Sequence, residues 1–228
     1  MTTVACLIAA HNEAERIAET IAAASGIPGV TRVIVVDDGS EDETADIADA
    51  AGAKAVRLMF NVGKGAALEA GATRVADADV VLLLDGDLGA AASQGELLLA
   101  PVLAGDADLA IAAFPPPASP AGFGFVKRLA SWGIRTFGRP PAGWTPSAPL
   151  SGQRALSSAT FEAARPFSGG YGVEVTTTIR ALRAGMRVVE VPTTMTHAAT
   201  ARDVSGFVHR GRQFTQVAGA LVRIAAGR

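Results

Sequence analysis

The chain has 228 residues, of which 49% are hydrophobic and 18% charged, and its formal net charge is −2. This length suffices for a well-buried core, and the charge balance excludes a disordered chain and a broad basic face that would bind nucleic acid. The one cysteine, Cys6, lies in an apolar run, so no intrachain disulfide can form, which fits a reducing compartment. We expect Cys6 to pack as a small hydrophobe.

The first half alternates between short apolar runs and helix-length segments. The patterns predict strands at 4–10, 33–36, 55–59 and 80–84, and helices through 17–24, 45–51 and 64–75. Because the strands are continuously apolar, they indicate βαβ units and a parallel sheet that is covered on both faces. The predicted fold class is therefore α/β.

The organisation changes after about Phe114. Residues 115–149 contain two stretches rich in Pro and Gly, with an amphipathic helix, FVKRLASWGIRTF, between them. We interpret 115–149 as a mobile excursion above the site and not as a second domain, so that residues 1–228 form a single domain. A helix after Gly172, a strand at 187–191 and a final helix from about 203 complete the chain.

The N-terminal stretch MTTVACLIAAHNEAE has no basic leader and reaches Glu13 early, which argues against a signal peptide. No apolar run approaches the ~20 residues that a membrane helix needs. We therefore expect a cytoplasmic protein, with peripheral membrane contact and a homodimer left open.

Polar clusters follow three of the predicted strands at the point where each strand ends. They read HNE after the first strand, DDGS after the second and DGD after the fourth. Ligands of open parallel sheets bind beyond the carboxyl ends of the strands. The clusters therefore predict a ligand site at this edge.

The acidic pair Asp37 and Asp38 ends the second strand. Adjacent carboxylates repel each other and cost stability unless donors or cations meet them. One alternative is a helix cap, in which Asp38 or Ser40 precedes a helix with an acidic first turn. A cap does not require Asp37 as well, so the reason for the pair stays open here.

Two further segments suit phosphates and a metal. In DGD, at residues 85–87, two carboxylates one residue apart can face a hard cation that bridges substrate phosphates, although a solvated turn is the alternative. The glycine turn NVGKG, at residues 61–65, offers backbone N–H groups and a lysine at a helix N-terminus, which is a natural phosphate site. Its spacing differs from that of a P-loop.

Taken together, HNEAERI, VIVVDDGSEDET, NVGKGAALEAG and LLLDGDL resemble the nucleotide-sugar half of family 2 glycosyltransferases over roughly the first 115 residues. The later segments SGQRAL and GYGVEV are similar to the glucosyl-3-phosphoglycerate synthase and mannosylglycerate synthase group. The resemblance implies a GT-A fold, a Rossmann-like three-layer sandwich with a mostly parallel central sheet. It also implies that residues 1–114 bind the nucleotide-sugar and that residues 115–228 face the acceptor.

The resemblance assigns five residues to the nucleotide. It implies that Glu13 and Asp38 contact the nucleoside, with Asp37 close by, so that donors on the base and ribose offset the repulsion of the pair. Lys64 corresponds to the lysine near the nucleotide, and Asp85 faces the ribose or a metal-bound water. UDP is the expected nucleotide.

The metal and catalytic residues also follow from the resemblance. Asp87 would ligate Mg²⁺ or Mn²⁺, and His197 takes the place of the late histidine that completes the metal site. Glu174 would orient or deprotonate the acceptor, and Arg154 would lie in the floor under the sugar. From the residues alone, His197 could be a packed or surface histidine, Glu174 a residue that favours a helix N-terminus, and Arg154 a surface salt-bridge residue.

The acceptor region departs from the phosphoglycerate-using enzymes. Those enzymes carry an Arg-x-Thr segment in a glycine-rich loop, where this chain reads GFGFVKRLASW, with Phe125 and Lys127. The departure argues against phosphoglycerate and favours another phosphorylated or a hydrophobic acceptor. The arginine-rich tail carries a broad apolar stripe, which predicts packing against the sheet or, alternatively, an interfacial helix that touches anionic lipid or a polyprenyl-phosphate acceptor.

The sequence therefore predicts a metal-dependent glycosyltransferase that moves a hexosyl group from a nucleoside diphosphate sugar to an unidentified acceptor. A nucleotidyltransferase shares the sheet architecture, but it usually starts with a glycine-rich, basic loop, and AAHNEAE is neither. A sugar-nucleotide-binding protein that has lost catalysis is the non-enzymatic alternative. No nucleic-acid partner is expected.

Overall fold

The computed structural model describes residues 2–114, 124–167, 172–195 and 204–226. The strands are β1 (Val4–Ala10), β2 (Val30–Asp37), β3 (Lys54–Arg57), β4 (Val80–Asp85), β5 (Leu109–Ala113), β6 (Arg154–Ser157) and β7 (Val188–Pro192). The helices are α1 (Ile17–Ser25), α2 (Thr44–Ala50), α3 (Lys64–Ala72), the 3-10 helix η1 (Gly89–Gln94), α4 (Gly95–Leu103), α5 (Gly124–Gly138), α6 (Ser158–Ala164), α7 (Val173–Arg183) and α8 (Val204–Ala225).

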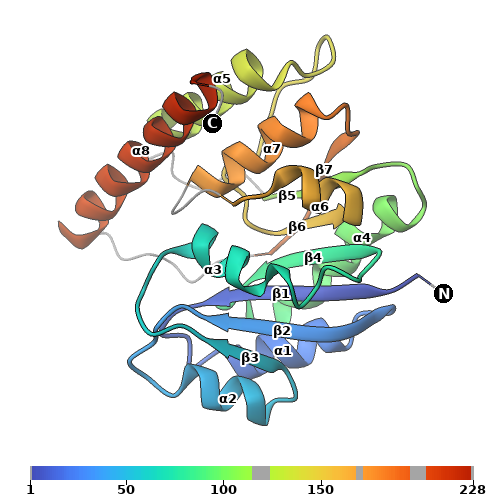
Figure 1. Ribbon diagram of the computed structural model, residues 1–228, viewed down its shortest axis with the longest axis vertical. Coiled ribbons are helices and arrows are strands. Elements are labelled where there is room, and N and C mark those ends of the chain that lie inside the picture. The colour runs from blue at the N-terminus through green and yellow to red at the C-terminus, as the bar shows by residue number, and fades with distance from the viewer. Residues whose placement is uncertain (1, 115–123, 168–171, 196–203, 227–228) are drawn as a thin grey trace.

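The seven strands form one sheet in the order β3-β2-β1-β4-β6-β5-β7 (Figure 1). Strand β6 runs antiparallel to both of its neighbours, β4 and β5, and the other pairs are parallel. Strands from both halves of the chain therefore share the sheet. The prediction of an α/β fold with a mostly parallel sheet is confirmed.

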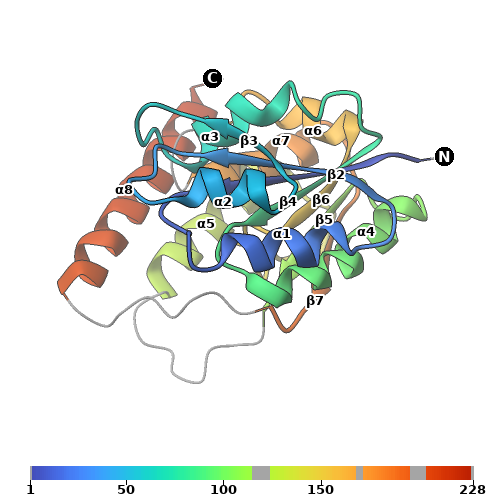
Figure 2. The same ribbon diagram turned by 90° about the horizontal axis from the view of Figure 1, so that it is seen from below.

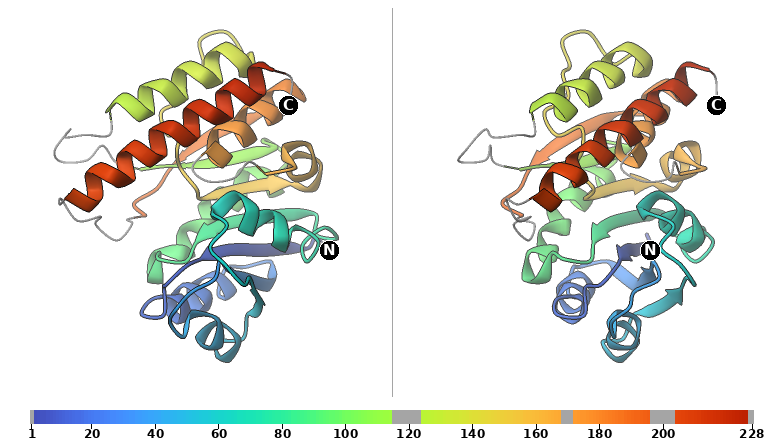
Figure 3. Two further views of the ribbon diagram at one scale, coloured as in Figure 1. Left: turned by 60° about the vertical axis from the view of Figure 1, so that its left-hand side comes forward. Right: turned by 90° about the vertical axis from the view of Figure 1, so that its left-hand side faces the viewer.

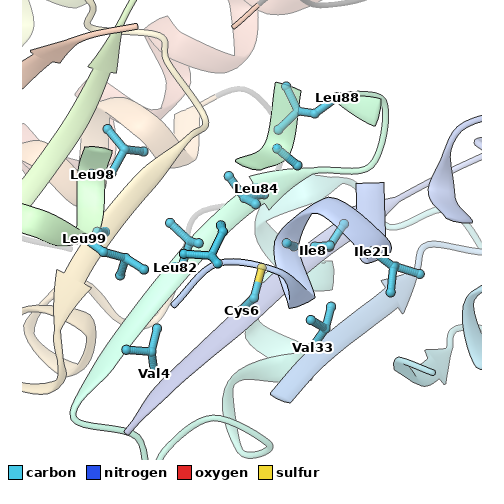
Figure 4. Packing of buried hydrophobic residues seen from close by; sticks show 14 of the residues in the cluster. Val4, Cys6, Ile8, Ile21, Val33, Leu82, Leu84, Leu88, Leu98 and Leu99 are labelled. Atoms are coloured by element: carbon cyan, nitrogen blue, oxygen red, sulfur yellow. The ribbon is translucent and has the colours of Figure 1, made fainter. Parts of the chain in front are cut away.

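Helices cover both faces of the sheet, since the strands are apolar on both sides. Figure 2 shows α1 and α4 on one face and α3, α6 and α7 on the other. On the first face, alternate residues of β1 and β4 pack with Ile21 of α1 and with Leu98 and Leu99 of α4. Cys6 lies fully buried in this cluster (Figure 4), and burial raises the pKa of its thiol far above the usual value. The expectation that Cys6 packs as a hydrophobe is confirmed.

The second face carries an additional layer. Helix α7 packs on the sheet through Val173 and Ala181, while its other side meets α5 and α8, which lie side by side in Figure 3. In the part of α8 whose side chains are described, Val217, Leu221 and Ile224 are buried against α5 and α7. The described part of the tail therefore packs mainly on helices. The prediction that it packs against the sheet is wrong for this part.

Most predicted elements of the first half are present, with β1 at the predicted bounds and the others shifted by a few residues. The predicted amphipathic helix within 115–149 is α5, although residues 115–123 of that segment lie outside the described part. Val222, an apolar residue of the predicted tail stripe, is 68% exposed and does not belong to the buried part of that stripe. In the described residues no helix is both long and apolar enough to cross a membrane.

Candidate active site

The strand register brings the polar clusters to one edge of the sheet. Ala10 at the end of β1 pairs with Asp37, and its neighbour Ala9 pairs with Asp85. Because β6 is antiparallel, its first residue, Arg154, lies opposite Leu83 near the same edge. The HNE, DDGS, DGD and SGQ segments therefore meet, although they are far apart in the sequence.

The turn after β1 is tied directly to the turn after β2. The backbone N–H of Asn12 donates to Ser40 Oγ at 2.9 Å, and Asn12 Oδ1 accepts from the N–H of Glu41 at 2.8 Å. The N–H of Glu13 donates to Thr44 Oγ1 at 2.8 Å. Asn12 has a φ of 57°, a conformation that asparagine tolerates better than most residues. Sequence reasoning missed Asn12 as the residue that joins the two turns.

The buried aspartate pair is satisfied by separate donors. Asp37 accepts from the backbone N–H of Ser40 at 3.2 Å and also from the Ser40 hydroxyl. Asp38 accepts from the N–H groups of Val62 and Gly63, each at 2.8 Å. These hydrogen bonds to the charged forms offset the repulsion between the two carboxylates.

Neither Asp38 nor Ser40 caps helix α2, so the cap interpretation is wrong. The N–H of Thr44, the first residue of α2, is bound instead by Asp42 Oδ1 at 3.0 Å. Asp38 holds the loop that precedes α3, where Gly63 has a φ of 88° that favours glycine. The Asp38 carboxylate thus positions the turn from which Lys64 projects.

Replacement of Asp38 tests this arrangement. We expect Asp38→Ala to lower the free energy of unfolding by roughly 1–3 kcal/mol, because the backbone N–H groups of Val62 and Gly63 lose a charged acceptor. It should also weaken uridine binding. Asp38→Asn retains one acceptor oxygen and should lose less stability in urea unfolding. Unchanged stability and uridine affinity in Asp38→Ala would show that the carboxylate does not hold this loop.

Lys64 links the two halves of the site. Its Nζ lies 2.5 Å from Asp85 Oδ1 and 3.1 Å from Glu174 Oε1. Burial by itself lowers the pKa of Lys64, but the charges of Asp85 and Glu174 outweigh it and raise the pKa above the usual lysine value. Glu174 is only 6% exposed, and its carboxylate meets Lys64. Glu174 is therefore more than a residue that favours the start of α7.

The segment that precedes β6 contacts the Asp85 carboxylate from a second side. Gln153 Nε2 donates to Asp85 Oδ2 at 2.6 Å, a contact that sequence reasoning did not assign. A Cβ at Gly152 would lie 2.2 Å from Lys64 Nζ and 2.9 Å from Asp85 Oδ2. Glycine at this position therefore permits the close approach of the backbone to the Lys64–Asp85 pair.

Arg154 lies below this cluster and is only 1% exposed, so the surface salt-bridge alternative is wrong. Its Nε donates to the Ser151 carbonyl at 2.8 Å and its Nη1 to Thr178 Oγ1 at 2.9 Å, while Nη2 is buried without a hydrogen-bond partner. Burial lowers the pKa of Arg154 to about 10, against the opposing charges of Glu174, Glu190 and Asp85. The guanidinium still carries positive charge at neutral pH.

The DGD turn is held by a buried threonine of α1. Thr20 Oγ1 donates to the Gly86 carbonyl and accepts from the N–H of Gly89, both at 2.8 Å. Arg16 also reaches the Asp87 carbonyl at 3.5 Å. Thr20 was not assigned from the sequence, although a polar residue at a core-facing position of an apolar helix is the signal that could have found it.

The electrostatics of the DGD turn suit a cation. Glu13 lies next to it, and burial, together with the negative charges of Asp87, Asp42 and Asp85 and against the opposing charge of Arg16, raises the pKa of Glu13 to about 7. Excess carboxylate charge of this kind fits a hard divalent ion. No set of three side chains that could ligate a metal gathers among the described residues, and His197 lies outside them.

The family model for "Glycosyl transferase family 2" matches residues 5–147 of the chain. The chain belongs to this family. Glycosyltransferase AglJ of Haloferax volcanii is 32% identical over 194 residues, which are 84% of this chain. This family 2 chain spans 62% of the length of AglJ. An uncharacterized protein of Methanocaldococcus jannaschii is 29% identical over 194 residues, covering 82% of this chain and 78% of that protein.

The fold matches solved structures of glucosyl-3-phosphoglycerate synthase from Mycobacterium tuberculosis. The complex with Mn²⁺, UDP and glucosyl-3-phosphoglycerate has a TM-score of 0.80 at 26% identity, covering 98% of this chain and 80% of that chain. The complex with Mg²⁺ and UDP has the same TM-score at 25% identity and covers 98% and 79%. The predicted GT-A fold and the resemblance to family 2 are confirmed.

The family 2 chain brings most of its predicted site residues to one edge of the sheet. Lys64, Asp85 and Glu174 are in direct contact, and Arg154 lies close below them. Other predicted residues, Glu13, Asp37, Asp38 and Asp87, occupy the turns of the same edge. Their assigned roles toward a nucleotide and a metal stay predictions.

Proposed function

We propose that this family 2 chain transfers a hexosyl group from a UDP-sugar to a hydroxyl or phosphate group of its acceptor. The single observation that carries the proposal is the position of Lys64, between Asp85 on the nucleotide side and Glu174 on the second half of the chain. The complexes of the similar synthase with UDP and Mn²⁺ or Mg²⁺ support this donor. Residues 1–114 would bind the donor and 115–228 would face the acceptor, within one domain.

The donor side is built to hold a nucleoside diphosphate. Asp37, Asp38 and Glu13 occupy the turns where the base and ribose would lie, and Asp38 fixes the loop that carries Lys64. An ammonium has three donors, of which two go to Asp85 and Glu174, so that one is available for a phosphate oxygen. Lys64 would therefore stabilise the negative charge of the leaving diphosphate.

On the acceptor side, Glu174 would orient the acceptor group or take its proton. Its carboxylate is held by Lys64 at 3.1 Å, and a carboxylate in a fixed position can accept a hydrogen bond from an acceptor hydroxyl or take its proton. Arg154, beneath the site, would act as a positioning residue. It donates to Thr178, whose hydroxyl donates in turn to the Glu174 carbonyl at 2.9 Å, so that it supports the first turn of α7.

A bound divalent ion, Mg²⁺ or Mn²⁺, would neutralise the negative charge of the diphosphate. Asp87 would hold it, with His197 as the second protein ligand and Asp85 facing a bound water or the ribose. The raised pKa of Glu13, caused by burial and the surrounding carboxylates, supports a cation at this turn. Thr20 would position the turn through Gly86 and Gly89.

The metal requirement gives a direct test of the donor site. We expect UDP to bind weakly in EDTA and at least about tenfold more tightly with Mn²⁺, because charge-assisted contacts contribute about 1.5–3 kcal/mol each. Calorimetric titration measures both affinities, and Asp87→Asn should remove the Mn²⁺ enhancement while leaving binding in EDTA unchanged. Equal UDP affinity in EDTA and Mn²⁺ would contradict the metal role.

The acceptor is proposed to be a phosphorylated or hydrophobic molecule, such as a polyprenyl phosphate. The similar synthase was solved with phosphoglyceric acid. The resemblance implies that Phe125 and Lys127, both exposed on α5, stand in the region where the phosphoglycerate-using enzymes carry an Arg-x-Thr segment. Family membership supports transfer of the sugar over nucleotidyl transfer. Hydrolysis of UDP-sugar in the absence of acceptor would distinguish an active transferase from a binding protein without catalysis.

A further inference from the structure

Helix α5 presents an outward face that is largely exposed, although the ring of Phe125 at its N-terminal end contacts Phe214 of α8, with ring centroids 5.3 Å apart. The inward face consists of Val126, Ala130 and Ile134, which are buried against α7 and α8. The outward face is defined by Phe125, Arg128, Trp132 and Arg135, spaced at three or four residues, which places them along one side of a helix. Phe125 is 67% exposed and Trp132 is 54% exposed. We call these four residues the α5 stripe.

The α5 stripe is cationic as well as aromatic. Arg128, Trp132 and Arg135 of the stripe line an open groove of about 340 Å³ together with Lys127 and Ser131. Residues 109–161 contain no Asp or Glu but four exposed basic residues, Lys127, Arg128, Arg135 and Arg139, whereas the whole chain carries 22 acidic residues against 20 basic ones. Helix α8, which packs beside α5, also contains no acidic residue. Positive charge is therefore concentrated on the α5 side of a nearly neutral chain.

We propose that the α5 stripe lies on the surface of an anionic lipid bilayer. Interfacial helices combine Lys and Arg with Trp and Phe along one face, because the basic groups meet the lipid phosphates while the rings enter the boundary between headgroups and acyl chains. The stripe has both components at helical spacing. This assigns lipid contact to α5 and not to the part of α8 whose side chains are described, since Val217, Leu221 and Ile224 there are buried against other helices.

A second copy of the chain is a less suitable partner for the α5 stripe than an anionic bilayer. In a two-fold symmetric dimer the same patch meets itself, so Arg128 and Arg135 of one copy would face the arginines of the second copy. Neither α5 nor α8 offers a carboxylate to pair with them. Like charges placed together across an interface oppose association. The charge of the stripe therefore favours an anionic partner.

The location of α5 connects the stripe with the candidate active site. The chain enters α5 after leaving the carboxyl end of β5 and enters α8 after leaving the carboxyl end of β7. Figure 3 shows both helices starting on the same side of the molecule. The first residues of the stripe thus lie toward the edge of the sheet where Lys64 and Glu174 meet. The inference does not depend on the identity of the sugar or acceptor.

Vesicle binding tests the proposal with the full chain. We expect flotation with vesicles of phosphatidylcholine and phosphatidylglycerol, little with phosphatidylcholine alone, and weaker binding as salt is raised. Arg128→Gln/Arg135→Gln should weaken binding about 25-fold, since each basic residue near an anionic leaflet contributes about fivefold. The control Lys54→Gln/Arg74→Gln removes the same charge from exposed positions elsewhere and should bind as the parent does.

Tryptophan fluorescence gives a second measurement. The chain has two tryptophans, so Trp144→Phe leaves Trp132 as the reporter, and its emission should shift to the blue on anionic vesicles. Trp132→Ala should weaken binding on the order of tenfold, as expected for loss of an aromatic ring that the bilayer would bury. Unaltered emission, equal effects of the two double variants, or a dimer in solution that Trp132→Ala dissociates would overturn the proposal.

Discussion

Glu174→Gln should lower transfer of the sugar by ~10²–10⁴, the usual contribution of a positioned acid or base. The substitution retains the shape of the side chain, and the amide oxygen can still accept from Lys64, whose Nζ lies 3.1 Å from the carboxylate. Only the charge and the ability to take a proton are lost. UDP affinity in Mn²⁺ should stay near that of the parent, because Asp85 and Lys64 remain paired.

The chain provides a matched control for the position of Glu174 in its helix. Glu174 is the second residue of α7 and Glu96 is the second residue of α4, and neither helix has a side-chain cap. Glu96→Gln therefore removes a carboxylate from the same helix position without touching the site, and such a carboxylate is worth at most roughly 0.3–1 kcal/mol of stability. Transfer rates and melting temperatures of both variants are the measurements. Full turnover in Glu174→Gln, with melting temperatures equal in the two variants, would remove Glu174 from the catalytic assignment.

Most of the first half could be predicted because its strands and helices carry local patterns. The run at 4–10 is apolar throughout and is bounded by polar residues, and β1 has these bounds. Strands β5 and β6 were not predicted. Strand β6 has four residues, Arg154–Ser157, and becomes a strand because it pairs between β4 and β5, a tertiary cause that no local pattern contains.

The candidate site was predictable in its parts but not in its contacts. The strand-end clusters pointed to one edge of the sheet, and the register confirms that they meet there. The contact of Lys64 with Glu174 joins residues 110 positions apart, so spacing alone could not reveal it. Burial of Arg154 likewise depends on the elements packed around β6. Sequence reasoning therefore left its location open.

Replacement of Lys64 should affect stability and nucleotide binding together. Lys64→Met removes the cation that lies between Asp85 and Glu174, whose side chains are 22% and 7% exposed. Loss of one partner of a fully buried pair costs ~3–5 kcal/mol, and partial exposure reduces the expected loss here to about 2–3 kcal/mol. UDP affinity should fall by roughly 10- to 150-fold, while uridine affinity changes little, because the ammonium is assigned to the diphosphate.

A double-mutant cycle separates the pair from the general cost of substitution. Because Glu174→Gln removes one of the two carboxylates that Lys64→Met leaves unpaired, the double variant should be more stable than the sum of the single effects predicts. Lys54→Met, at an exposed position of β3, is the control for loss of a lysine and should leave both stability and UDP binding unchanged. Urea unfolding and titrations with UDP and uridine provide the measurements. Additive effects of Lys64→Met and Glu174→Gln on stability, with UDP and uridine weakened equally, would show that Lys64 neither couples to Glu174 nor serves the diphosphate.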